Sequence, residues 1–232
     1  MTWHAMQHLS RSSFLIASLA LAVTGCTVTP NMWPFRDNER TSYPTPAMRT
    51  DAIREFAARS NGLDTPEQQE IASQLARQIQ VEPDPLVRGT IVETLARFNT
   101  PLASQVMVAG LHDADPIVRR KCCHGLGERG DPSAIEPLSR ALREDDQMDV
   151  RVAATEALGR IPSPEALKAL TAALEDRDPA LQFAAVQSVK QISGQDFGGD
   201  VRAYLQYAQC ENPSIAKPPT SVAERLRGMT PF

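Results

Sequence analysis

Hydrophobic residues recur along this chain at a nearly fixed interval of 31 or 32 residues. A period of this length is typical of a solenoid, in which each unit is one supersecondary element that cannot bury its apolar face alone. The sequence therefore predicts a stack of similar units. Three separate sets of positions keep one register: Val87, Val118, Val150 and Leu181; Leu95, Leu126, Leu158 and Val189; and Leu111, Leu142, Leu174 and Leu205.

The apolar spacing inside each unit is helical. In one unit Val118, Cys122 and Leu126 are four residues apart, which puts their side chains on one face of a helix. The second half of the same unit repeats the pattern with Leu138 and Leu142. Each unit is therefore predicted to be two helices of about twelve residues.

The helix starts carry a common signal, a short oxygen-bearing side chain followed by proline. The oxygen accepts a hydrogen bond from a free backbone N–H, and proline at the next position lacks an N–H and already has a helical φ. The pairs predicted to open first helices are Asp84-Pro85, Asp115-Pro116 and Asp178-Pro179, and those predicted to open second helices are Thr65-Pro66, Thr100-Pro101, Asp131-Pro132 and Ser163-Pro164.

We predict an all-α protein whose repeat domain, residues 47–209, is an α-solenoid (superhelix) of about five stacked antiparallel helix pairs. The first unit is expected to be a degenerate cap. Gln147 stands where other units have Asp-Pro, so the start of that helix is expected to shift. The predicted units are 47–81, 84–113, 115–145, 147–176 and 178–209.

These units resemble the HEAT family, and more closely its short phycobilisome-lyase-like subtype, which reads Asp-Pro-x-Val-Arg and then Ala-Leu-Gly. Here those residues are 115–119 with 125–127, and 150–151 with 157–159. The resemblance covers roughly residues 47–209 and is specific to the fold. It implies that the arginine column, Arg88, Arg119 and Arg151, hydrogen-bonds the turns between repeats, with a binding stripe as the alternative; Gln182 replaces arginine in the last unit.

Composition and charge narrow the class of partner. The chain of 232 residues is 42% hydrophobic and 5% aromatic, with a formal net charge of −4. These values describe a soluble helical protein. Because no long Lys/Arg run occurs, nucleic acid is not expected as a partner.

Residues 1–25 are predicted to be a signal peptide. They contain an apolar run of ten residues, 14–23, which is too short for a membrane-spanning helix. With Cys26 after small residues, the segment resembles a bacterial lipoprotein signal, which implies diacylglyceryl modification of Cys26. The alternative is an ordinary signal peptide with a chance cysteine. We expect a cell-envelope protein with its domain outside the cytoplasm, and Thr27 slightly favours the outer membrane.

Two flanking segments are expected to lack repeats. Residues 26–46 are predicted to be a flexible, proline-containing tether. Residues 210–232 are predicted to be a tail with a short helix, because Ser221 to Glu224 matches a capping box. That helix either folds back onto the last unit or docks on another protein.

Few residues have a reactive appearance. Cys122-Cys123-His124 suggests a metal or redox site, but both cysteines occupy columns of small packing residues. Gly194 to Asp200 suggests a calcium loop but lacks the spacing and final glutamate of one, so its residues are predicted to end and begin helices. No metal, cofactor or catalytic residue is therefore expected.

We predict a non-catalytic, lipid-anchored scaffold or adaptor, monomeric, that binds a protein through its inner helix row. The alternative, suggested by the resemblance, is an enzyme or enzyme subunit of the bilin-lyase-like or metal-hydroxylase-like type. The exposed side chains expected on the inner row are Gln105, Glu136, Ser139, Lys168 and Thr171.

Overall fold

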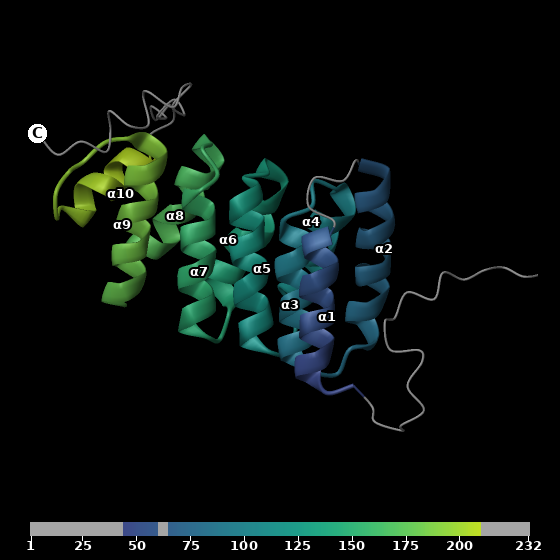
Figure 1. Cartoon of the computed structure of the whole chain (residues 1–232). Helices are drawn as coiled ribbons and strands as arrows, with labels where there is room; N and C mark the ends of the chain where they lie inside the picture. Colours follow the sequence, from purple (N-terminus) through teal and green to yellow (C-terminus); the bar gives the residue numbers. More distant parts are fainter. Residues whose placement is uncertain (1–43, 60–64, 210–232) are drawn as a thin grey trace, which may run out of the picture. The chain divides into compact units, whose positions relative to one another are not determined.

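The computed structural model describes residues 44–59 and 65–209, all within the compact unit Tyr43–Phe232. The described part is all-helical, and its helices pack as a repeat solenoid (Figure 1). A short 3-10 turn, Pro132–Ala134, precedes α6. The helices are α1 (Pro46–Arg59), α2 (Thr65–Val81), α3 (Pro85–Ala96), α4 (Pro101–Gly110), α5 (Pro116–Arg129), α6 (Ile135–Glu144), α7 (Met148–Gly159), α8 (Pro164–Leu174), α9 (Pro179–Ser193) and α10 (Val201–Gln209).

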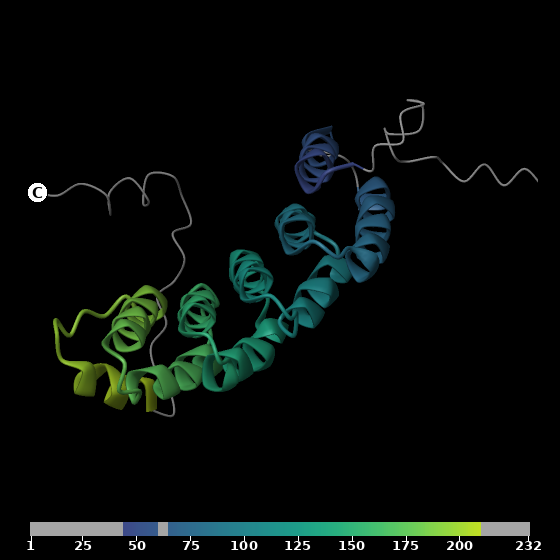
Figure 2. The same cartoon turned by 90° about the horizontal axis from the view of Figure 1, so that it is seen from below.

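The helix pairs form two rows. Helices α1, α3, α5, α7 and α9 make the odd row, and the other five make the even row. Within this unit the rows follow an arc, and Figure 2 shows the odd row on its hollow side. Our expectation that α4, α6 and α8 form the inner row is therefore wrong.

Small residues between neighbouring odd helices explain why the odd row lies on the hollow side of the arc. A Cβ added at Gly127 of α5 would lie 2.7 Å from Cα of Ala157 in α7. A Cβ at Gly159 of α7 would lie 2.8 Å from Cα of Ser188 in α9. Odd helices thus approach one another more closely than a side chain at these positions would permit, which brings that row to the inside of the curve.

Most predicted helix starts are confirmed. Asp84, Asp115 and Asp178 each accept hydrogen bonds from backbone N–H groups of the first turn, and Thr100 and Ser163 do the same for second helices. The expected shift of the helix start at Gln147 is wrong: α7 begins at Met148, which keeps the 32-residue offset from the start of α5 at Pro116. Residue 147 precedes α7 without a side-chain capping bond, and the proline at 132 opens the 3-10 turn, so that α6 begins three residues later.

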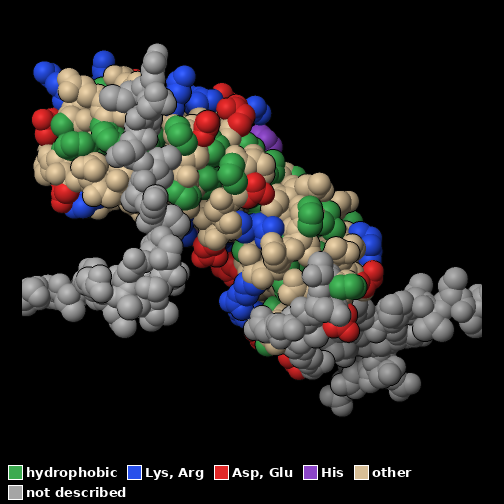
Figure 3. Space-filling view, turned by 90° about the horizontal axis from the view of Figure 1, so that it is seen from above, with side chains coloured by type: hydrophobic (Ala, Val, Ile, Leu, Met, Phe, Trp, Pro, Cys, Tyr) green, Lys and Arg blue, Asp and Glu red, His purple; other side chains and the backbone are tan. Residues whose placement is uncertain are grey.

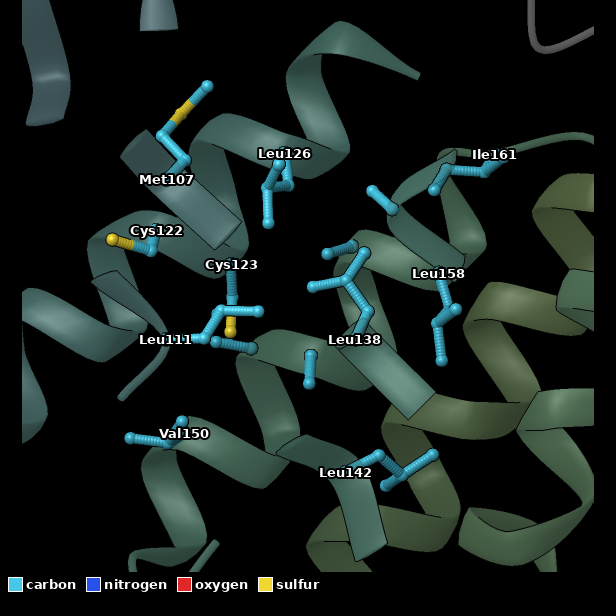
Figure 4. Close-up of a cluster of buried hydrophobic side chains, with 14 of the residues drawn as sticks. Met107, Leu111, Cys122, Cys123, Leu126, Leu138, Leu142, Val150, Leu158 and Ile161 are labelled. Carbon is cyan, nitrogen blue, oxygen red and sulfur yellow. The ribbon is translucent and has the colours of Figure 1, made fainter. Parts of the chain in front are cut away.

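The recurring apolar positions form one continuous core. Nearly all of them are 0–6% exposed, whereas Leu205 in the last helix is only half-buried. Figure 4 shows Leu126, Leu138 and Leu158 projecting from neighbouring helices into this interior. The predicted helical faces are therefore the faces that bury against the next helix.

The connection between α9 and α10 uses its polar side chains locally. Gly194 has a φ of 68° and ends α9, and Asp200 accepts from the N–H groups of the first turn of α10. The Tyr204 hydroxyl donates to Asp196 at 3.1 Å, and the ring of Phe197 packs edge-on against Tyr204. Both carboxylates thus have protein partners.

The predicted signal peptide, Cys26, nearly all of the tether and the C-terminal tail lie outside the described residues. No helix in the described ranges is both long and apolar enough to cross a bilayer.

Candidate functional site

An arginine near the start of each of α3, α5 and α7 hydrogen-bonds to the turns that connect successive helix pairs. Arg88 donates from Nε and Nη2 to the two carboxylate oxygens of Asp113, at 2.8 and 2.7 Å, and from Nη1 to the carbonyl of Pro83 at 2.9 Å. Arg119 makes the same pair of bonds to Asp145, both at 2.8 Å. Each arginine therefore joins the turn before its own helix to the turn after the same repeat.

The ladder extends in both directions. Arg151 donates to Asp176 and to the carbonyl of Leu142, and Gln182 donates to the carbonyl of Asp176 at 2.7 Å. At the other end Arg49 donates to both carboxylate oxygens of Glu82, at 3.1 and 2.8 Å.

Sequence reasoning missed the Arg49 rung because Arg49 lies 39 residues before Arg88 and breaks the period of 31 or 32. A local signal was present. Residues 45–49 read Thr-Pro-Ala-Met-Arg, which parallels Asp-Pro-Leu-Val-Arg at 84–88.

Among the ladder carboxylates, those of Asp113, Asp145 and Asp176 have pKa values below the usual one. Burial by itself would raise the pKa of Asp113, but hydrogen bonds from Arg88 and from the backbone N–H of Asp115, together with the charges of Arg88 and Arg119, lower that pKa below its usual value. The Arg88 and Asp113 side chains are only 15% and 14% exposed. Because Arg88 and Asp113 already bind each other, we assign the ladder to stabilising the packing between repeats rather than to binding a partner.

The two central thiols are packing groups. Cys122 and Cys123 are fully buried, and burial raises the pKa of both, for Cys123 to about 12. A thiol with such a pKa is protonated at neutral pH and is a poor nucleophile. Across residues 44–59 and 65–209, no group of three or more His, Cys, Asp and Glu side chains could hold a metal ion.

The five predicted partner-binding residues lie on the even row, which is the outer one. Gln105, Glu136 and Lys168 are exposed, and Thr171 is half-buried. The expectation that Ser139 is exposed is wrong. Its side chain is only 4% exposed, and its hydroxyl accepts a hydrogen bond from Arg143 of the next turn. It is buried because the helices packed against α6, which include α7 and α8, cover this position.

A shallow hollow of about 380 Å³ lies between α4 and α6 on the same outer row. Val108, Leu111 and Ala141 give it an apolar floor, and His112 and Glu144 lie at its rim. Its deeper carboxylates are those of the arginine ladder, so they are already paired.

The odd row presents a different surface on its hollow side. Leu86 of α3 and Ile117 of α5 occupy the same position in adjacent repeats and are 57% and 41% exposed. Two turns further along these helices lie Glu93 and His124, and Glu156 of α7 continues them as a second matched line of exposed or half-exposed polar groups. The apolar pair thus lies beside a polar line on the same row. On the face drawn in Figure 3, charges of both signs are interspersed among apolar side chains.

Comparison with protein families shows which family this chain belongs to. The family described as HEAT repeats matches residues 71–159 and 135–204, more than half of the chain. The chain belongs to the HEAT-repeat family. This HEAT-repeat protein is similar to the uncharacterized phycocyanin operon protein Z of Pseudanabaena tenuis (strain PCC 7409), with 30% identity over 144 residues, 58% of this chain and 68% of that protein. The resemblance to phycobilisome-lyase-like proteins is therefore confirmed.

Solved structures share the helical-repeat architecture. The complex of CpcE and CpcF of phycocyanin lyase from Nostoc sp. PCC7120 matches with a TM-score of 0.51 and 16% identity, over 76% of this chain and 79% of that chain. Human deoxyhypusine hydroxylase in complex with glycerol matches with a TM-score of 0.49 and 24% identity, over 52% of this HEAT-repeat chain. The chain spans 42% of the hydroxylase's length. At 16% identity the likeness to the complex of CpcE and CpcF concerns the fold alone.

Proposed function

We propose that this HEAT-repeat protein is a non-catalytic adaptor of the bacterial cell envelope, anchored through a lipid on Cys26, which binds another protein on the hollow side of its odd row. Membership of the HEAT-repeat family supports a protein partner. The observation that carries the choice of surface is the matched exposure of Leu86 and Ile117 in adjacent repeats.

Two exposed aliphatic side chains at one register position suit an extended partner. Adjacent helices lie about 8–10 Å apart, so the two side chains offer anchor points spaced one repeat apart. An elongated partner segment could bury both while its polar groups meet the neighbouring line of Glu93, His124 and Glu156. A few buried apolar contacts inside a polar rim supply most of the free energy in such interfaces.

The surface is tested by a pair of double variants in the full-length protein. Leu86→Ser with Ile117→Ser removes the proposed anchors, and Gln105→Ser with Lys168→Ala alters the outer row at similarly exposed positions. Each pair should leave the melting temperature nearly unchanged, because exposed substitutions alter stability by only about 0.5 kcal/mol each.

Chemical crosslinking in intact cells, followed by identification of the crosslinked proteins, provides the measurement. We expect the Leu86/Ile117 variant to lose a crosslink that wild type and the outer-row variant retain. Loss of the crosslink in the outer-row variant alone would instead place the partner on α4 and α8. Stoichiometric metal or a chromophore absorbance in the purified protein would overturn the non-catalytic assignment.

The lipid anchor has its own test. Two or three acyl chains, at about 0.8 kcal/mol per buried CH₂, hold a protein to a bilayer far longer than one chain does. Cys26→Ala should therefore move the protein from the membrane fraction to the soluble fraction. An unchanged membrane fraction would contradict the lipoprotein assignment and leave the repeat surface to be judged separately.

A further inference from the structure

Phe183 is an apolar side chain left uncovered at the end of the repeat stack. It is 66% exposed on α9. The matching positions in earlier repeats face the following repeat: a Cβ at Gly89 would meet the Lys121 side chain of α5, and Val152 of α7 is half-buried. Phe183 therefore lies on the face that a further repeat would cover.

The same face shows why an ordinary repeat does not follow. Gly127 and Gly159 allow α7 and α9 to pack closely against the helix before them, but the corresponding residue of α9 is Lys190. Lys190 forms an ion pair with Asp196 in the connection to α10. A long charged side chain in the glycine column prevents another helix from packing at the same short distance, so the cover for Phe183 must differ from a repeat.

The chain leaves the last helix close to this face. The side-chain amide of Gln209, the last residue of α10, donates to Glu175 at 3.3 Å. Glu175 is the C-cap of α8, and α9 begins four residues later at Pro179. Phe183 is four residues further on, a rise of about 6 Å along the helix. The exit point and the uncovered ring thus lie near the same end of α9.

The residues that follow have the length and the pattern to return to Phe183. Twelve residues, 210–221, separate Gln209 from Val222, which allows a reach of up to about 40 Å. Val222 and Leu226 are four residues apart, so a helix would place both on one face, and Ser221 and Glu224 supply a capping box for it. So short a helix is marginal by itself and needs a surface to pack on.

We propose that the segment 221–227 of the same chain packs Val222 and Leu226 over Phe183 and closes the C-terminal end of the HEAT-repeat stack. The segment then acts as the terminal cap that helical repeats need to shield their last apolar face. This inference is independent of which surface binds the partner.

A fluorescent reporter in the full-length chain tests the contact. Phe183→Trp is introduced in a background where Trp3 and Trp33 are changed to Phe, so that the new indole is the sole tryptophan. Its emission and its quenching by acrylamide are then measured in three forms: without further change, with Leu226→Ser, and with the control Arg227→Ser, which lies off the proposed contact face.

We expect a shielded indole in the first form and in the control. Leu226→Ser should shift emission to the red and raise the quenching constant toward that of a free tryptophan derivative. Shielding should be the same at every protein concentration. Equal quenching in all three forms would overturn the proposal. Shielding that grows with concentration would assign the cover to a second copy, and shielding that appears only after adding envelope extract would assign it to another protein; both outcomes overturn the intramolecular cap.

Discussion

Replacing Gly159 with alanine should destabilise the protein, although alanine normally favours a helix. The added Cβ would lie 2.5 Å from Cβ and 2.8 Å from Cα of Ser188 in α9. Carbon atoms prefer separations of about 3.5–4.0 Å. Helices α7 and α9 must therefore move apart by about 1 Å, and Ser188, whose hydroxyl donates to the carbonyl of Thr155 at 3.0 Å, must move with α9.

The expected magnitude follows from three contributions. Overpacking by one methyl group costs about 1–3 kcal/mol. Weakening the hydrogen bond from Ser188 to Thr155 costs about 0.5–1.5 kcal/mol. Alanine returns at most about 1 kcal/mol of helix propensity, and less here because Gly159 is the last residue of α7. Together these contributions give a loss of about 0.5–4.5 kcal/mol in the free energy of unfolding.

Gly89 of α3 supplies the matched control. A Cβ there would meet Cδ of Lys121 at 2.9 Å, which is part of a flexible side chain rather than backbone. Moving Lys121 weakens its partly exposed ion pair with Glu93, a loss of at most about 1 kcal/mol that the gain in helix propensity offsets. Gly89→Ala should therefore leave the stability nearly unchanged.

Urea unfolding followed by far-ultraviolet circular dichroism measures both variants against wild type. Thermal melting provides a second measure, at about 2–4 °C for each kcal/mol in a domain of this size. If Gly159→Ala proved as stable as wild type or as Gly89→Ala, close glycine packing between odd helices would not be what sets their spacing.

Three further results are expected in the same assays. Leu126→Ala should cost about 2–5 kcal/mol by leaving a cavity, whereas Glu156→Ala, at an exposed position, should cost about 0.5 kcal/mol or less; equal urea midpoints would contradict the repeat register. Arg119→Lys keeps the charge but loses the paired bonds to Asp145, at a cost of about 1.5–3 kcal/mol, and wild-type stability would show that the second bond contributes nothing. Burial would raise the pKa of Asp145, but the bonds from Arg119 and a backbone N–H lower it below the usual 3.8. Its stabilising effect is therefore complete above that value and is lost as the pH falls through and below it, so acid should lower the melting temperature of wild type more than that of Asp145→Asn; an equal fall in both would contradict the linkage.

Much of this fold could be predicted because its determinants are local or periodic. Proline after Asp, Thr or Ser marks a helix start through bonds within one turn, as at Asp115 and Ser163. The apolar columns mark the buried faces because every repeat solves the same packing problem, as the complete burial of Val118 and Leu158 illustrates. The arginine ladder was readable for the same reason, apart from Arg49, whose unit has a different length.

The candidate surface was less predictable. Helical spacing identified Gln105 and Lys168 as exposed, but it placed Ser139 on the surface as well, where the structure buries it. The sequence pattern gives the angle of a residue around its own helix, whereas burial also depends on how far the neighbouring helices extend over it.

The sequence by itself determined the number and order of the helix pairs and the residues that form their shared core, since both follow from the periodic burial of apolar side chains. Only the tertiary structure decided which row lies on the hollow side and that Leu86, Ile117 and Phe183 stay uncovered. Those features depend on distances between helices of different repeats, which close contacts such as Gly159 against Ser188 set and which the spacing of apolar residues along the chain does not give.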